Sequence, residues 1–226
     1  MILTKEEAII KIHQSAVIYK ENLLNKNILF LSISNNKSYY FEGAFFDNNF
    51  KHLTGVEGGL EPSLFFNAAL NNRLSKSDIV FKKDGTSELK IKVLPKLMSI
   101  HLNARMIGDY NYSGIQLVAD KLAGTTTSVM GFIQRKSGYF IPNTVLKENL
   151  SNIASKPYQR VLSTFIKPFS DNMYTEVSYI IKDNSLLTID ILKTLKDKVD
   201  YPNIKASFPI TWDNEMLCRE LYPPSV

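Results

Sequence analysis

Apolar residues near the start of the chain recur at intervals of three and four, the spacing that places them on one face of an α-helix. The predicted helix covers residues 4–24, and Thr4 with Glu7 forms the Thr-x-x-Glu pattern of a capping box at its start. Its apolar face consists of Ala8, Ile9, Ile12, Ala16, Tyr19 and Leu23. The pattern therefore predicts a long amphipathic helix as the first element.

Two apolar runs then favour β-strands over residues 28–34 and 38–46. Asn35-Asn36-Lys37 joins them tightly, which predicts a hairpin. A loop carrying His52 should follow, and Pro62 suits the first turn of a second helix. Residues 89–102 have helical spacing, but Pro95 lacks a backbone donor, so the helix should kink or begin there.

The pattern changes after residue 104. Short apolar or alternating runs cover 105–110, 117–123, 128–134 and 138–141, with turn residues between them. They predict an antiparallel β-meander. Thr144 is expected to cap a short helix over 145–154.

Strands at 160–165 and 174–182, a helix over 186–199 and a proline-containing surface tail complete the prediction. The expected fold class is α+β, with N-terminal helices packed on an antiparallel meander and a C-terminal strand and helix extension. Residues 1–157 should form the main domain, and residues 158–226 an extension packed on it.

Composition narrows the class of protein. Hydrophobic residues make up 44% and charged residues 22% of the 226 residues, as in soluble globular proteins. The N-terminus lacks a secretory pattern, apolar runs are too short to span a bilayer, and the single cysteine, Cys218, forms no intramolecular disulfide. We expect a cytoplasmic protein without a membrane partner. CxxC and HExxH motifs are absent, so we expect no protein-bound metal and no cofactor, and any chemistry should be metal-independent or use an ion that the substrate brings.

The net charge is +5, and much of the excess lies between residues 82 and 105. This window holds two acidic residues, Asp84 and Glu88, against six basic ones: Lys82, Lys83, Lys90, Lys92, Lys96 and Arg105. A basic surface favours polyanions such as nucleic acid, although a solvated helix face has the same composition.

The chain has three histidines, and His52 has the setting of a catalytic group. It lies between an aromatic strand and a glycine-rich loop, where a general acid or base is often placed. A structural, hydrogen-bonded histidine fits the same position. Lys51 could pair with phosphate or face water, and Thr54 could bind phosphate, orient His52 or stabilise a turn. His13 and His101 are expected to be structural, with His101 partly exposed at a helix end.

The predicted meander carries the other candidates. Asp120-Lys121 places two charges in an apolar run, so one should face inward or a cleft unless the strand lies at an edge. Thr125 and Thr127 could bind phosphate or form a polar turn. Arg135 could clamp phosphate and Tyr139 could stack on a base, although solubility and core packing explain both residues equally.

Several segments in this order resemble the phage-encoded barnase–EndoU–colicin–RelE-like (PBECR) nucleases of phages and mobile elements. The most specific are Phe50-Lys51-His52-Leu53-Thr54-Gly55 and Tyr139-Phe140-Ile141-Pro142-Asn143-Thr144. The resemblance runs from about residue 28 to 153. It implies a helix packed on a four-stranded antiparallel meander, and a metal-independent endoribonuclease that activates a ribose 2′-OH against the adjacent phosphate.

The resemblance also implies roles for individual residues. His52 falls on the family histidine and would be the general acid or base, and Thr54 falls on the adjoining hydroxyl and would contact phosphate. Lys121, from the charged pair in the apolar run, is our choice for the cation that neutralises the transition state, with Arg135 second. The predicted substrate-binding residues are Lys51, Asp120, Thr125, Thr127, Arg135, Tyr139, Asn143 and Thr144.

The leading hypothesis is an endoribonuclease, acting as a toxin or host-takeover effector in the cytoplasm of a bacterial host. RNA is the expected partner, with a protein inhibitor or host defence protein as a second. The alternative is a non-catalytic phage accessory or anti-defence protein on a nuclease-like scaffold, and a third hypothesis is an immunity or structural protein.

Overall fold

The computed structural model describes residues 3–111 and 117–223. Helix α1 (Lys5–Asn22) begins at the predicted capping box: the Glu7 amide donates to Thr4 Oγ1 at 3.2 Å, and the Thr4 amide donates to Glu7 Oε2 at 2.9 Å. Its buried face includes Ala8, Ile12 and Tyr19, which confirms the predicted apolar face.

The predicted hairpin is also confirmed. Strands β1 (Lys26–Ser34) and β2 (Lys37–Phe45) pair antiparallel. Asn35 and Asn36 have φ of 49° and 58°, as in the tight turns that match the twist of paired strands. The opposite edge of β1 pairs with β7 (Gln159–Pro168), the first strand of the predicted extension.

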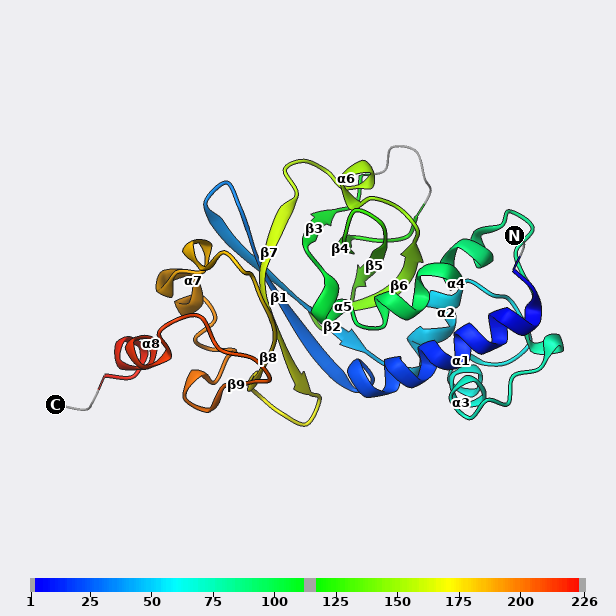
Figure 1. Cartoon of the computed structure of the whole chain (residues 1–226), viewed down its shortest axis with the longest axis horizontal. Coiled ribbons are helices and arrows are strands. Elements are labelled where there is room, and N and C mark those ends of the chain that lie inside the picture. The colour runs from blue at the N-terminus through cyan, green and yellow to red at the C-terminus, as the bar shows by residue number, and fades with distance from the viewer. Residues whose placement is uncertain (1–2, 112–116, 224–226) are drawn as a thin grey trace.

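The predicted meander consists of β3 (Met106–Asp109), β4 (Lys121–Gly124), β5 (Val129–Gln134) and β6 (Phe140–Leu146), each antiparallel to the next. Strand β3 also meets β7, and β6 meets β2. The order β1-β2-β6-β5-β4-β3-β7 therefore returns to β1 and closes seven strands into a ring. Figure 1 shows the meander beside the long β1, β2 and β7.

The fold is α+β as predicted, but the sheet is mixed rather than purely antiparallel. β6 runs parallel to β2, and β8 (Glu176–Ile180) runs parallel to β9 (Lys205–Ala206). These pairs join segments far apart in the chain, so local patterns did not predict them.

The N-terminal helices gather at one end of the molecule (Figure 1). Besides α1 they are α2 (Phe50–Thr54), α3 (Pro62–Leu70) and α4 (Thr86–Leu97), with 3-10 turns η1 (Asp47–Asn49) and η2 (Lys76–Asp78). The short α5 (Ile100–Asn103) follows α4 and lies beside the strands in the middle of the molecule (Figure 1). Pro62 occupies the first turn of α3, as predicted. The remaining elements are α6 (Leu150–Ile153), η3 (Asn184–Leu186), α7 (Ile189–Lys193), η4 (Tyr201–Asn203) and α8 (Asn214–Leu221).

Strand β1 separates two hydrophobic cores. Ile28 and Phe30 belong to the core under the N-terminal helices, whereas Leu29 and Leu31 belong to the core under the C-terminal elements. Successive strand side chains point to opposite faces, so one strand serves both cores.

Several local predictions were wrong. His52 lies on helix α2 rather than in a loop, because Phe50 and Leu53 bury one side of that turn. Pro95 lies inside α4, so the helix does not begin there, and the helix predicted over 89–102 is divided between α4 and α5. The strand predicted over 117–123 is formed only at Lys121–Gly124 among the described residues.

Three further corrections concern single residues and the C-terminal region. Thr144 lies within β6, and Asn149 caps the short helix α6 instead. His101 is buried, with 7% of its surface exposed, and burial lowers its pKa to about 4. The helix predicted over 186–199 is reduced to η3 and α7, and the tail contains α8.

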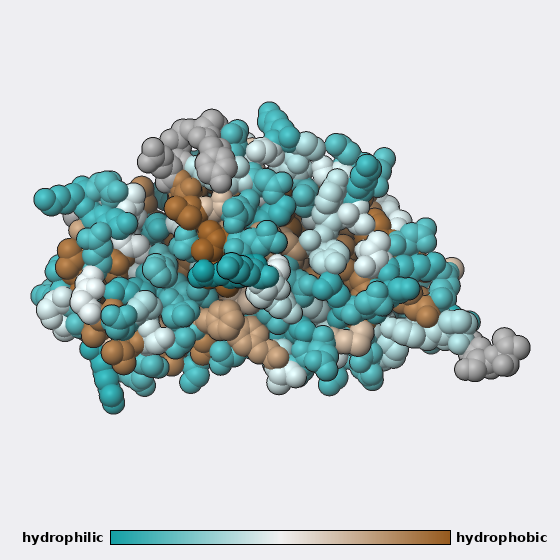
Figure 2. Space-filling model, turned by 180° about the vertical axis from the view of Figure 1, so that it is seen from behind, coloured by the Kyte–Doolittle hydropathy of each residue, from teal (hydrophilic) through white to brown (hydrophobic). Residues whose placement is uncertain are grey.

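None of the helices in the described ranges is long and apolar enough to cross a bilayer. Seen from behind, hydrophobic residues lie in small groups separated by hydrophilic ones (Figure 2).

Candidate active site

Helix α2 is a rigid support for His52. The Phe50 ring packs edge-on against Tyr19 and Phe66, with centroids 5.4 and 5.3 Å away. Leu53 is also fully buried, whereas the His52 side chain is exposed on the opposite side of the turn. The core therefore fixes the backbone while the imidazole faces solvent.

His52 lines a pocket of about 650 Å³. Its walls come from α2 with the loop that follows it, the first residue of α3, the segment from Lys82 into α4, residues 117–118 and β6. The lining residues are Lys51, His52, Gly55, Val56, Glu57, Gly58, Pro62, Lys82, Asp84, Thr86, Lys90, Leu117, Val118, Asn143, Thr144 and Leu146. Cations and hydroxyls thus share the pocket with an apolar rim, on which Val118 is 72% exposed.

Lys90 brings a second titratable group to this pocket. Its ammonium donates to Thr144 Oγ1 at 2.8 Å, which ties α4 to β6. Burial, and secondarily the charge of Lys82, lowers the pKa of Lys90 to about 8, while Asp84 opposes the shift. A lysine with this pKa is still mostly protonated at neutral pH but can release a proton more readily than an exposed one.

Gly55 makes room for Lys90. It ends α2 with φ of 68°, a left-handed conformation that glycine adopts without strain. A Cβ at this position would lie 2.5 Å from Lys90 Cδ. Ser87 Oγ donates to the Gly55 carbonyl at 2.6 Å, so α4 is fastened at the point where the lysine passes.

The environment of His52 favours its neutral form. Partial burial, then the positive charges of Lys51 and Lys90, lower the pKa of the imidazole below its ordinary value of 6.5. A neutral imidazole at pH 7 can accept a proton, which is what a general base requires.

A β-bulge in β6 explains why two consecutive residues line the same pocket. Phe132 pairs with Pro142 and Gly131 with Thr144, which leaves Asn143 as the extra residue. Bulges re-aim side chains beside functional sites. Asn143 Nδ2 donates to the Val118 carbonyl at 2.9 Å, while Thr144 accepts from Lys90.

The structure brings four of the predicted site residues together: Lys51, His52, Asn143 and Thr144. Lys51 also has a structural task, because its ammonium donates to the carbonyls of Gly58 (3.0 Å) and Leu60 and so holds the loop closed.

Thr54 and Lys121, predicted to join His52, lie outside the pocket lining. Thr54 is fully buried, and its hydroxyl donates to the Lys51 carbonyl at 2.7 Å and accepts from the Val56 amide at 3.3 Å. Lys121 forms an ion pair with Asp109 on the adjacent strand. Thr54 therefore stabilises the turn that carries His52, and Lys121 fastens β4 to β3.

The remaining predicted contacts lie elsewhere. Asp120 Oδ2 accepts from the Gln134 amide at 2.7 Å, and Thr127 Oγ1 lies 3.2 Å from Thr125 Oγ1. Arg135 and Tyr139 line a separate pocket.

Lys90 is the principal site residue that sequence reasoning missed. It was counted in the basic window at 82–105 but given no individual role. The signal was its position on α4 beside Ile91 and Leu94, which are fully buried. A lysine next to the buried stripe of a helix must extend its ammonium toward a polar partner.

Within residues 3–111 and 117–223, no group of three or more His, Cys, Asp or Glu side chains is placed to hold a metal ion.

Comparison with protein families then identifies the chain's relationship. The model of phage-Barnase-EndoU-ColicinE5/D-RelE like nuclease4, the PBECR4 family, matches residues 11–183. The chain belongs to the PBECR4 family. This confirms the resemblance drawn from the sequence, and it indicates a nuclease with a nucleic acid substrate. No curated protein and no solved structure matches the chain.

The PBECR4 match covers every residue of the His52 pocket and continues through β7 and β8. The family region therefore includes strands on both sides of β1. The segment after residue 183 contributes α7, β9 and α8 to the second core.

Proposed function

We propose that this PBECR4 protein is an endoribonuclease that cleaves cytoplasmic RNA of a bacterial host in the His52 pocket, without a metal ion. The proposal rests on one observation: His52 and Lys90 line the same pocket in a member of a nuclease family. The environment favours the neutral form of His52, and burial lowers the pKa of Lys90 to about 8.

In the proposed reaction His52 accepts the proton of a ribose 2′-OH. The 2′ oxygen attacks the adjacent phosphorus, and the bond from phosphorus to the 5′ oxygen breaks. Lys90 stabilises the negative charge of the phosphorane and gives a proton to the leaving 5′ oxygen. The products are a 2′,3′-cyclic phosphate and a free 5′-OH.

The roles of the neighbouring residues follow from their contacts. Thr144 positions the Lys90 ammonium, and Asn143 offers an amide to the phosphate or sugar. Lys90 takes the charge-neutralising role that the sequence assigned to Lys121, because the Lys121 ammonium is paired with Asp109.

The test uses a labelled single-stranded oligoribonucleotide in EDTA. Wild-type protein should cut it and leave 2′,3′-cyclic phosphate ends, and a single 2′-deoxy sugar should block cleavage at that position. His52→Ala should lose roughly 10²–10⁴-fold in rate, the usual share of a general base. Lys90→Gln should lose roughly 10²–10³-fold, as for removal of one electrostatic stabiliser.

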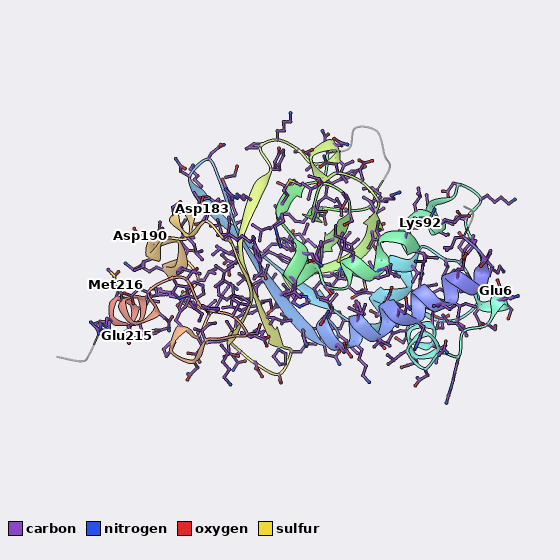
Figure 3. All side chains as sticks on the ribbon, viewed as in Figure 1. Glu6, Lys92, Asp183, Asp190, Glu215 and Met216 are labelled. Atoms are coloured by element: carbon purple, nitrogen blue, oxygen red, sulfur yellow. The ribbon has the colours of Figure 1, made fainter. Side chains whose placement is uncertain are left out.

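The matched control for Lys90→Gln is Lys92→Gln, because Lys92 is exposed on the same helix (Figure 3). The Lys92→Gln protein should cleave RNA at the wild-type rate. Cleavage of the 2′-deoxy position, or unchanged cleavage by His52→Ala, would overturn the mechanism. RNA binding without cleavage by wild-type protein would favour the non-catalytic alternative.

A further inference from the structure

A second pocket of about 320 Å³ lies against the outer side of β2 and the β5–β6 hairpin. It has no part in the proposed chemistry. Its lining residues are Ala44, Phe46, Asn48, Asn49, Arg135, Ser137, Tyr139 and Ile141. The set combines aromatic rings, side-chain amides and a guanidinium in a space at the small end of ligand-binding pockets.

Phe46 is an exposed aromatic ring on a fixed backbone. Its side chain is 40% exposed, although a phenyl ring is normally buried. The Phe46 amide donates to Asn49 Oδ1 at 3.0 Å, and its carbonyl accepts from Tyr19 Oη at 2.7 Å. The ring centroid lies 4.8 Å from that of Phe169. The protein therefore holds an aromatic surface in place at solvent.

The β5–β6 hairpin places Arg135 and Tyr139 together. The Arg135 amide donates to the Tyr139 carbonyl at 2.9 Å, and Gly138 supports the turn with φ of 89°. Arg135 is exposed, and Tyr139 is half-buried. A cation and a second aromatic ring thus face the same pocket as Phe46.

Two continuous segments connect this pocket with the His52 pocket. Strand β6 contributes Ile141 to the second pocket and Thr144 to the His52 pocket. At the rise of a β-strand, these two residues are separated by about 10 Å. Turn η1, with Asn48 and Asn49, leads directly into α2 and His52. The two pockets therefore share two supporting segments, which is the arrangement that one extended ligand bound at both would require.

We propose that the second pocket binds an unpaired base of the RNA strand whose scissile phosphate lies beside His52. The base stacks on Phe46 and Tyr139, Asn48 contacts its edge, and Arg135 contacts the neighbouring phosphate. This inference rests on the proposed function, and it assigns single-stranded RNA as the substrate class.

The first test measures binding alone, in a His52→Ala background that leaves the RNA intact. Fluorescence anisotropy with a labelled oligoribonucleotide should show about tenfold weaker binding for Tyr139→Ala, within the range for loss of one base stack. Tyr139→Phe keeps the ring and should bind as the background does. Lys136→Gln is the matched control, because Lys136 is exposed on the same hairpin and lies outside the lining.

A second measurement locates the base. Oligoribonucleotides with one abasic residue at successive positions should bind more weakly at a single position, and Tyr139→Ala should abolish that position dependence. A structural role for Tyr139 would weaken binding at all positions alike. The proposal is overturned if Tyr139→Ala binds every oligonucleotide as the background does, or keeps the position dependence.

The two proposals fail separately. If binding depends on Tyr139 but the wild-type protein does not cleave, the nuclease mechanism fails and the base pocket stands. If the wild-type protein cleaves while Tyr139→Ala retains its KM and position preference, the base pocket fails and the mechanism stands.

Discussion

The charge of Lys90 affects the protonation of His52 in the pocket that they share. The ammonium of Lys90 helps to lower the pKa of His52, after partial burial and the charge of Lys51. Burial of the ammonium, then the charge of Lys82, lowers the pKa of Lys90 to about 8. The shift at His52 keeps the imidazole neutral at pH 7, and the shift at Lys90 leaves the ammonium mostly protonated there. The neutral imidazole and the charged ammonium therefore coexist between about pH 6.5 and 8.

This pair predicts a bell-shaped dependence of kcat/KM on pH. The rate should rise as His52 loses its proton, with a midpoint below 6.5, and fall as Lys90 loses its proton near pH 8. Lys90→Arg should move the alkaline limb to higher pH, because a guanidinium stays protonated, even if the rate is lower. An alkaline limb that is the same in both proteins would remove Lys90 from the reaction.

Replacing Gly55 should lower the free energy of unfolding for two reasons that can be measured separately: backbone strain at positive φ and contact of the new side chain with Lys90. Gly55→Ala forces a side chain into the left-handed region, which costs about 1–2 kcal/mol, and places a Cβ against Lys90. Gly85→Ala has comparable strain at φ of 76° but meets nothing within 4 Å. Urea unfolding should show the larger loss for Gly55→Ala, together with reduced cleavage. Equal losses of unfolding free energy in the two variants, with normal cleavage by Gly55→Ala, would show that the close approach of Lys90 to Gly55 has no effect on stability or activity.

At the scale of elements, sequence patterns correctly predicted those features that depend only on residues close together in the chain. The capping box of α1, the Asn35-Asn36 turn and the Pro62 start of α3 each depend on neighbours in the chain. The bulge at Asn143 depends on pairing with β5, and the partner of Lys90 depends on packing α4 against β6. Reasoning from the sequence therefore named Lys51, His52, Asn143 and Thr144, which the structure places in one pocket, but it gave Lys90 no role.

Gly131 lies opposite the bulge and should be required for it. A Cβ there would lie 2.8 Å from Thr144 Cγ2 and 3.1 Å from Ala119 Cβ. Gly131→Ala should therefore destabilise the protein by about 1–3 kcal/mol, the usual cost of overpacking. Adding Thr144→Ser removes the methyl group and keeps the hydroxyl for Lys90, so part of the stability and the cleavage should return. Additive losses in urea unfolding of the double variant would contradict this account.

At the scale of the whole molecule, β1 and β7 link two cores that lie on opposite sides of them. Val161 and Ile166 of β7 belong to the first core, and Leu162 and Phe165 to the second. Glu6 on α1 and Glu215 on α8 lie toward the two ends of the molecule in Figure 3. The sequence predicted that the C-terminal region packs on the same domain. The unbroken apolar run of β1 is consistent with a strand covered on both faces, but it does not show which elements cover each face.

Shared strands predict that the two cores unfold together. Trp212 is the sole tryptophan and reports on the second core, where its ring lies 6.4 Å from Phe165. Tryptophan fluorescence and far-ultraviolet circular dichroism should therefore change at the same urea concentration.

Trp212→Phe preserves most of the packing, so the urea midpoint measured by circular dichroism should change little. Trp212→Ala should lower the free energy of unfolding by about 3–5 kcal/mol. In both variants, cleavage per folded molecule should equal that of the wild type, because the His52 pocket lies in the other core. A fluorescence transition that precedes the dichroism change would show that the C-terminal elements detach while the ring of strands stays folded.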